Sequence, residues 1–487
     1  MTGRWWDENW YVVKGYRFIQ DINMGNFSDP FWYEDGTDHP PLSSYFYGLA
    51  GYSEFLTYAP RTIMNALPGW QKDFPVFRYD LTNPRLVSVA ISTFSILLLF
   101  FFGLRYFSFF VAVASASIMA MLPHFLGYSQ LVDLESWVML FFTACVFSYY
   151  LYLETNKRRF LILTGILTGL NLSVKQSGVL ILLFYILTYF VWKKLTRSKK
   201  ITPMHLLYIT LLSLLVFVLV CPIPWFHIPQ FIHYTEDLWF KNSGLIPELI
   251  FGRHMGAHFF YYILAFLITT PGLILLLLLS GTRVAYQKKK WKYAGVIIWF
   301  LVPFFLTVFH ERQNMVRYII QVYAPVAVLS AMSLEYLSRI INKNELTKYA
   351  GLVAVLGYLL VILVRISPFY LDYYNELVGG TKNVYEKKLF FLGWFGEGLR
   401  QPGIYIAQHA KKNDTIGLAL DPPQTLYTIP TLRYSLFNPE VQYKYVVVNY
   451  FNIIRIGFNP SVLKRNYRLV YQEKVEGAVL ASVYKHI

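Results

Sequence analysis

Two carboxylates stand side by side near the amino terminus, at Asp7 and Glu8, among the tryptophans Trp5, Trp6 and Trp10. A carboxylate held beside aromatic rings can act as a general base toward a hydroxyl group. The alternative is a solvated acidic pair at the start of a loop, with the tryptophans placed at a membrane surface. The residue types alone leave both interpretations open.

His39 stands before two prolines, Pro40 and Pro41, and an aromatic run follows them. Proline fixes the backbone angle φ, so this pair would also fix the direction in which His39 points. The alternative is a turn that only starts an amphipathic helix. His39 is therefore a candidate for lining a site.

Polar residues also interrupt the apolar stretches. His124, Asp133 and Glu135 lie in one short segment between two such stretches, where acidic groups tend to face a cavity. Lys175 stands where one apolar stretch ends and the next begins. Its ammonium group can meet a lipid phosphate there, or it can merely extend to the membrane surface.

Arg317 and Tyr318 follow a polar segment, 310–316, and open another apolar stretch. A guanidinium group suits bidentate binding of phosphate. The alternative role is an anchor at a helix end. Arg317 is the second candidate cation for a phosphate.

Other chemistry has little support in the sequence. His254 and His258 have the spacing of two metal ligands on one helix face, but no third ligand is evident nearby, so no metal site is predicted. The sequence contains no Walker loop, no Rossmann glycine pattern and no G-x-S-x-G. Nucleotide-sugar binding and hydrolase chemistry are therefore not indicated.

The amino-acid composition indicates what kind of structural elements must position these residues. Of 487 residues, 55% are hydrophobic and 15% are charged, and the mean hydropathy is +0.39. A soluble chain carries about 25% charged residues. In a soluble protein the net charge of +16 would suggest nucleic acid as a partner, but here the basic residues lie between apolar stretches, which favours an explanation by membrane topology.

Cys145 and Cys221 lie in or beside apolar runs and are expected to pack there.

Stretches of about 20 apolar residues can each cross a bilayer as a helix. About ten candidate spans are predicted, at 84–104, 107–123, 135–153, 160–174, 177–192, 204–221, 258–280, 293–309, 318–336 and 348–366. The basic loops at 154–159, 193–200, 281–292 and 337–348 all fall on one side, which the positive-inside rule assigns to the cytoplasm.

This topology divides the chain into three parts. Residues 1–83 form a first outer segment, 84–366 the transmembrane domain, and 367–487 an outer C-terminal domain. A chain that begins outside without a signal peptide is expected to have one further membrane helix upstream of Met1.

The C-terminal part has a mixed pattern typical of a small α/β domain. We expect a helix at 397–411 and strands at 415–420, 445–450 and 478–484. The complete fold class is therefore an α-helical polytopic membrane protein with a small α/β domain on the outer side.

The order of the motifs resembles the dolichyl-phosphate-mannose protein O-mannosyltransferase family, whose wider prokaryotic relatives share the GT-C membrane fold. The similar segments are the acidic pair, HPPL, NPRLVSVAIS, LVDLESWVMLFF, GLNLSVKQSG, RYIIQVYAP, PFYLDYYNELVGG and GWFGEGLRQ. They cover most of the chain up to about Arg400. Gln321 departs from the Leu-Pro that many members have after Arg-Tyr.

The resemblance implies transfer of a sugar, such as mannose, from a polyprenyl-phosphate donor to an acceptor outside the cytoplasm, with inversion. Carried over to this sequence, it implies a catalytic base at Asp7 and a positioning carboxylate at Glu8. Lys175 and Arg317, with the neighbouring Tyr318, would bind the lipid phosphate. His39 and Asp133 would line the cavity.

The resemblance leaves partners and alternatives open. The acceptor is a protein, a lipid or a glycan, the surroundings are the lipids of a cell membrane, and nucleic acid is not expected. Carboxylates near a phosphate can hold a divalent cation, but a lipid phosphate carries less charge than a nucleotide sugar, so no cofactor is predicted. The alternatives are a flippase or transporter of a lipid-linked sugar and an inactive relative that binds glycan.

Overall fold

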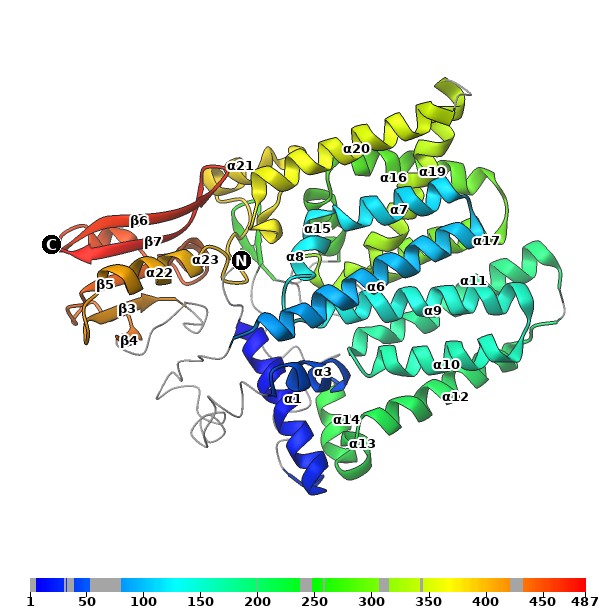
Figure 1. Cartoon of the computed structure of the whole chain (residues 1–487), viewed down its shortest axis with the longest axis horizontal. Coiled ribbons are helices and arrows are strands. Elements are labelled where there is room, and N and C mark those ends of the chain that lie inside the picture. The colour runs from blue at the N-terminus through cyan, green and yellow to red at the C-terminus, as the bar shows by residue number, and fades with distance from the viewer. Residues whose placement is uncertain are drawn as a thin grey trace.

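The structure is a computed structural model that describes residues 6–29, 32, 39–52, 80–198, 200–236, 248–256, 259–305, 315–341, 345–420 and 432–487. Figure 1 shows a bundle of helices with a small sheet domain at one end. Two further helices, α1 and α3, cross beside that end of the bundle. The fold therefore has the two parts that the sequence predicts, a helical membrane domain and a C-terminal α/β domain.

The bundle contains the long apolar helices and several short ones. Those before the middle of the chain are α6 (Thr82–Tyr106), α7 (Phe109–Ala120), α8 (Pro123–Tyr128), α9 (Glu135–Thr155), α10 (Arg158–Leu172), η1 (Gln176–Val179), α11 (Leu180–Thr196), α12 (Pro203–Val220), α13 (Ile223–Phe226) and α14 (Ile228–Glu236). Those after it are α15 (Tyr261–Thr269), α16 (Gly272–Gln287), α17 (Trp291–Leu301), η3 (Val302–Phe305), η4 (Arg317–Val322), α19 (Tyr323–Ile341) and α20 (Glu345–Ile366).

Six of these helices are long and apolar enough to cross a membrane, and a bent pair gives a seventh. Each of the ten predicted spans coincides with helix in the described residues, but α7, α10 and α17 with η3 are shorter than a full span. In the apolar stretch of the span formed by η4 and α19, 89% of the residues are buried in protein, whereas only 11% are buried in that of α12. Leucines on α12 such as Leu211 and Leu219 are more than half exposed, as expected for a helix that faces lipid.

The span predicted at 258–280 is not a single helix, because α15 and α16 meet at an angle of 115°. Pro271 starts the second helix and lacks the N–H that would continue the first. Asn375 donates from its side chain to the carbonyl oxygens of Leu267 and Thr270, both at 2.6 Å. Glu376 accepts from the Gly272 N–H at 3.2 Å. A segment after the last span therefore satisfies the backbone groups freed at the break.

The segment before the bundle contains α1 (Trp6–Met24) and α3 (Leu42–Ala50). The helix predicted after the two prolines is confirmed, with Pro41 as its N-cap residue. Gly15 and Gly48 let the two helices touch backbone to backbone. A Cβ atom added at Gly15 would lie 1.7 Å from the Ser44 carbonyl oxygen. Small residues at helix crossings permit this close approach.

Alanine at Gly15 is expected to lower the free energy of unfolding by about 1–3 kcal/mol, because it forces α1 and α3 apart. Equilibrium unfolding of the detergent-solubilised chain measures this. The matched control is Gly357→Ala in the middle of α20, where an added Cβ meets nothing within 4 Å. That control should be neutral or slightly stabilising, since alanine is the better helix former. Equal losses in both variants would contradict the close packing of α1 on α3.

The C-terminal domain is a five-stranded mixed sheet in the order β4-β3-β5-β7-β6. Its elements and the helices around it are α21 (Gly380–Lys387), α22 (Arg400–His409), β3 (Thr415–Ala419), β4 (Arg433–Leu436), β5 (Tyr445–Asn449), α23 (Tyr450–Arg455), β6 (Tyr467–Val475) and β7 (Ala478–His486). The predicted helix and three predicted strands correspond to α22, β3, β5 and β7. The sequence patterns did not reveal β4 and β6. Both cysteines are free and buried, as expected for packing residues.

Candidate active site

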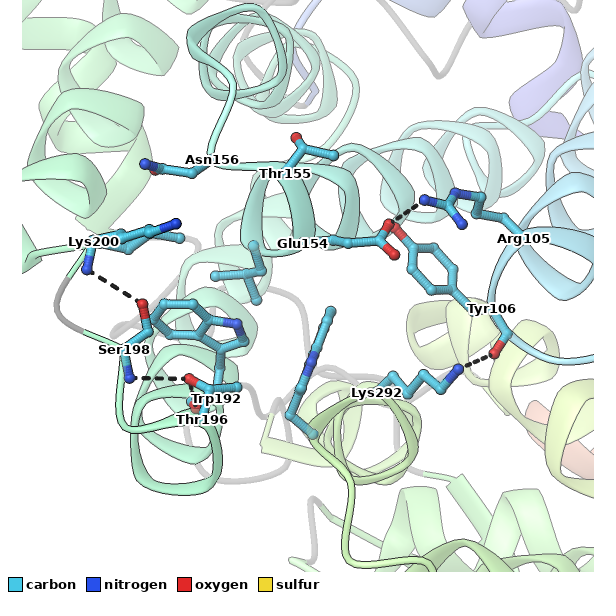
Figure 2. Close-up of a pocket in the computed structure, with 13 residues that line it drawn as sticks. Arg105, Tyr106, Glu154, Thr155, Asn156, Trp192, Thr196, Ser198, Lys200 and Lys292 are labelled. Atoms are coloured by element: carbon cyan, nitrogen blue, oxygen red, sulfur yellow. Dashed lines mark hydrogen bonds and ion pairs between the residues drawn. The ribbon is translucent and has the colours of Figure 1, made fainter.

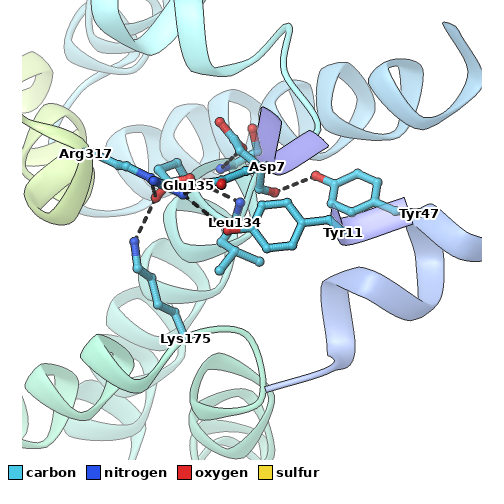
Figure 3. A network of polar contacts seen from close by, with 9 residues as sticks. Asp7, Tyr11, Tyr47, Leu134, Glu135, Lys175 and Arg317 are labelled. Atoms are coloured by element: carbon cyan, nitrogen blue, oxygen red, sulfur yellow. Dashed lines mark hydrogen bonds and ion pairs between the residues drawn. The ribbon is translucent and has the colours of Figure 1, made fainter. Parts of the chain in front are cut away.

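Four segments far apart in the sequence meet where the first turn of α1 approaches the bundle. They are the start of α1, the start of α9, the turn before η1 and the start of η4. Each supplies a charged side chain, and the four are Asp7, Glu135, Lys175 and Arg317. Figure 3 shows these side chains pointing toward one another. All four begin or precede a helix, so their backbones are held by the bundle.

Arg317 is the centre of this cluster and is only 6% exposed. Its Nη2 atom donates to Asp7 Oδ2 at 3.1 Å and to the Tyr11 hydroxyl at 3.2 Å. Its Nε atom donates to Glu135 Oε1 at 2.9 Å. The planar guanidinium group therefore bridges two carboxylates, which a lysine ammonium could not do in the same geometry.

Lys175 approaches the same carboxylate from the other side. Its Nζ atom donates to Glu135 Oε1 at 2.7 Å and lies 4.2 Å from the centre of the Tyr318 ring. Glu135 is fully buried and holds both cations within reach of one oxygen. The site is thus a compact group of two cations and two carboxylates, shielded from bulk water, where each charge acts strongly.

Glu8 is fully buried, which makes the solvated acidic pair wrong. Its two oxygens accept from Arg85 Nε at 2.8 Å and Arg85 Nη2 at 2.6 Å. Oε1 also accepts from the Val132 N–H at 3.0 Å. These bonds join α1 to α6 and to the segment before α9. Such a bidentate pair fixes the direction of the α1 first turn and so the position of Asp7.

His39 and Asp133 border the cluster. The ring of His39 lies 6.2 Å from the ring of Tyr11, and its carbonyl oxygen accepts from Lys14 at 3.0 Å. Asp133 accepts from the Ser136 N–H at 3.2 Å through one carboxyl oxygen, while the other has no hydrogen-bond partner in the described part of the chain. Burial raises the pKa of the Asp133 carboxyl well above its usual range, and the charge of Glu135 raises it further.

A buried chain of contacts supports the turn that carries Arg317. The Met315 N–H donates to the Tyr261 hydroxyl at 2.8 Å, and Tyr261 lies near the buried Glu248 of β1 (Glu248–Ile250), which pairs with β2 (Arg253–Met255). Burial raises the pKa of Glu248 from 4.5 to about 8, against the opposing effects of Tyr261 and the positive Arg455. The folded chain therefore holds this carboxyl in its neutral form below that pH.

The free energy of unfolding is expected to fall as the pH rises from about 4.5 to about 8. In that window the folded state keeps a proton on Glu248 that the unfolded chain has lost, so rising pH favours unfolding by up to about 1.4 kcal/mol per pH unit. Unfolding at a series of pH values measures the slope. Glu248→Gln should flatten it, whereas Glu440→Gln, at an exposed position, should leave it unchanged. Equal slopes in both variants would contradict a neutral buried Glu248.

The structure brings together most of the residues singled out from the sequence. Asp7, Lys175, Arg317 and Tyr318 lie in the cluster, and His39 and Asp133 lie at its border. His124 instead bonds to the Tyr373 carbonyl at 3.2 Å. The sequence predicts no role for Arg85 or Tyr11, and for Glu135 only a place at the lip of a membrane helix, facing a cavity.

No group of three metal-ligating side chains occurs within the described ranges. His254 lies in β2 with its ring 6.0 Å from that of Phe391. Its predicted partner, His258, is outside the described residues. The prediction that the protein works without a metal cofactor stays a prediction.

Comparison with known proteins gives a partial sequence match and a fold. Residues 34–236 match the sequence model of the dolichyl-phosphate-mannose-protein mannosyltransferases. Apo ArnT from Cupriavidus metallidurans aligns with a TM-score of 0.52 at 14% identity, covering 99% of this chain and 94% of that one. The oligosaccharyltransferase AglB from Archaeoglobus fulgidus aligns with a TM-score of 0.45 at 13% identity, covering 100% of this chain and 70% of that one. No curated protein sequence matches the chain.

The match over residues 34–236 includes the start of α9 and Lys175, and the ArnT likeness extends over nearly the whole bundle and the C-terminal sheet domain. Mannosyltransferases thus provide a matching sequence model for part of the chain, and ArnT provides the matching fold. The chain is a multi-pass membrane protein with the GT-C fold, and its residues 34–236 are similar in sequence to the dolichyl-phosphate-mannose-protein mannosyltransferases.

Proposed function

We propose that the chain transfers a sugar from a polyprenyl-phosphate donor to a hydroxyl-bearing acceptor. One observation carries this proposal, namely that Arg317 bridges Asp7 and Glu135 while Lys175 binds the same Glu135 oxygen. A partly exposed carboxylate, Asp7, beside cations that a buried carboxylate holds in place suits a reaction in which a hydroxyl loses a proton and a phosphate departs. ArnT from Cupriavidus metallidurans has also been solved with undecaprenyl phosphate bound, the kind of lipid phosphate that a donor of the proposed class would release.

The cations would act on the leaving group. As the glycosidic bond breaks, the phosphate oxygen gains negative charge, and preorganised positive groups lower the energy of that state. Arg317 and Lys175 are held by Glu135 before any substrate arrives, so little rearrangement would be needed during the reaction. The ring of Tyr318 packs beside Lys175 and would limit where its ammonium group can move.

Asp7 would accept the proton of the attacking hydroxyl. Its side chain is 13% exposed, more than that of Arg317, and therefore forms the more open part of the cluster. A single base and a single displacement predict inversion at the anomeric carbon. Glu8 would position Asp7 through Arg85 without touching substrate, which is a narrower role than the sequence suggested.

Asp133 and His39 would line the substrate cavity. A neutral Asp133 carboxyl can donate a hydrogen bond to a sugar or phosphate oxygen from its unpartnered side. The family match makes mannose the first sugar to test. The acceptor would be a protein hydroxyl, a lipid or a glycan on the outer side of the cell membrane, since the basic loops lie at the other end of the helices.

One feature favours a second candidate, transport of a lipid-linked sugar. Discontinuous helices such as α15 and α16 are common at the substrate sites of transporters. Here, however, the break is closed by Asn375 and Glu376 from a later segment. The four charged groups of the cluster also lie together at or just before the starts of α1, α9, η1 and η4, which favours chemistry at one membrane surface.

The deciding experiment reconstitutes the chain in vesicles with a panel of radiolabelled polyprenyl-phosphate sugars, beginning with mannose, and with nucleotide sugars as a second panel. A transferase releases labelled sugar from the lipid or passes it to an added acceptor. A transporter moves the intact lipid-linked sugar to the other leaflet without cleaving it. Cleavage of a polyprenyl-phosphate sugar supports the proposal and identifies the donor, whereas movement without cleavage, or cleavage of nucleotide sugars alone, overturns it.

A further inference from the structure

A second polar pocket lies at the far end of the helices that carry the active site. Three helical segments connect the active-site cluster to this pocket. They are α6 from Arg85 to Arg105, α9 from Glu135 to Glu154, and η1 with α11, which lead from Lys175 to Trp192. At a rise of 1.5 Å per residue, the 20 residues between Arg85 and Arg105 in the same helix span about 30 Å. That is the thickness of a bilayer core, so the pocket is level with the opposite headgroup layer.

The pocket has a volume of about 490 Å³ and a basic lining. Arg105, Lys200 and Lys292 supply three cations, and Glu154 supplies one carboxylate. Two tryptophans, Trp192 and Trp291, complete the wall. Indole rings beside lysine and arginine are typical of the boundary between membrane and water.

The cations keep donors available for a ligand. Lys292 donates one hydrogen bond from Nζ to the Tyr106 carbonyl oxygen at 2.7 Å, and an ammonium group has three N–H donors. Arg105 pairs with Glu154 through Nη2 at 2.7 Å, and its side chain is 50% exposed. Figure 2 shows Lys200 and Asn156 on the opposite side of the pocket from Lys292. The pocket thus presents cations from two sides and carries a net charge of about +2.

We infer that this pocket binds the phosphate headgroup of an anionic lipid in the leaflet opposite the active site. Basic pockets between membrane helices on the cytoplasmic side suit such headgroups. The position of the pocket at the membrane surface favours a lipid over a soluble anion, because its walls include the ends of the membrane-spanning helices α6, α9 and α11. This site is separate from the transfer reaction, so the inference does not depend on the proposed function.

Tryptophan fluorescence tests the inference directly, since Trp192 and Trp291 are in the wall. The full chain in neutral detergent is titrated with phosphatidylglycerol whose acyl chains carry bromine, which quenches nearby indole rings. Brominated phosphatidylcholine serves as the neutral comparison. Saturable quenching at lower concentrations of phosphatidylglycerol is expected, with a smaller amplitude in Trp192→Phe. Equal quenching by the two lipids would overturn the inference.

Substitutions separate the pocket from general surface charge. Lys292→Gln and Lys200→Gln should each raise the phosphatidylglycerol concentration at half-maximal quenching about fivefold, as expected for one basic side chain near a membrane. Lys157→Gln is the matched control, because Lys157 is exposed beside the same helix ends but does not line the pocket. An equal shift in this control would overturn the site. If inorganic phosphate reversed the quenching by phosphatidylglycerol, the occupant of the pocket would be a soluble phosphate and not a lipid headgroup.

Discussion

Asparagine at Asp7 is expected to lower the rate of sugar transfer by a factor of about 10²–10⁴, the range for loss of a general base. The amide keeps the size of the side chain but cannot accept a proton from the attacking hydroxyl at neutral pH. Binding of the donor should change much less, because the phosphate would be held by Arg317 and Lys175. Turnover and donor affinity, measured separately in reconstituted vesicles, distinguish the two effects.

Asp29→Asn is the matched control for this substitution. Asp29 follows the same helix, pairs with Arg17 at 2.6 Å and takes no part in the cluster. It should retain the wild-type rate of transfer. Full activity in Asp7→Asn would remove Asp7 as the base, and equal losses in both variants would indicate damage to α1 in place of lost chemistry.

Lysine at Arg317 is expected to lower turnover by a factor of about 10²–10³ although the charge is kept. The guanidinium group binds Asp7 through Nη2 and Glu135 through Nε, and a single ammonium group cannot occupy both positions. Asp7 would then lose its fixed direction, and the departing phosphate would lose a preorganised donor. Single-turnover rates with a saturating donor report this loss without interference from binding.

Arg339→Lys supplies the comparison on the same helical segment. Arg339 lies near the other end of α19, is 68% exposed and pairs with Glu335 at 3.2 Å. An exposed pair of this kind contributes about 1 kcal/mol or less, so transfer should be unchanged. If Arg317→Lys matched the activity of Arg339→Lys, charge alone would suffice and the bridging geometry would have no catalytic role.

The sequence located the cations of the site well because both interrupt a strong pattern. Lys175 and Arg317 each stand at the boundary of a long apolar stretch, where a charge is expensive and therefore conspicuous. Their common partner was not predictable in the same way. Glu135 binds Arg317, which is 182 residues away in the sequence, and Lys175, which is 40 residues away. No local sequence pattern predicts these contacts. Tyr11 was hidden for the same reason, as one tyrosine among 39.

The fold shows the same difference between features that local sequence predicts and features that depend on distant contacts. Hydropathy predicted the positions of the membrane helices, since their length is set by the bilayer. It did not predict the bend between α15 and α16, because the capping groups of Asn375 and Glu376 come from a different part of the chain. In the sheet domain, β5 is buried throughout and mostly apolar, and the sequence predicted it. The edge strand β4 is mostly exposed and lacks that signal.

The late capping of the bend has a consequence for biosynthesis. Gly272 enters the membrane 104 residues before Glu376 is synthesised, which takes roughly 5–20 s at the usual rates of translation. During that interval the carbonyl groups of Leu267 and Thr270 lack their final partner, Asn375. The neighbouring Tyr374, whose hydroxyl approaches Met315 Sδ at 3.9 Å, also arrives late. A nascent chain that stops before residue 374 would therefore hold an unfinished membrane domain, exposed to the quality-control proteases of the membrane.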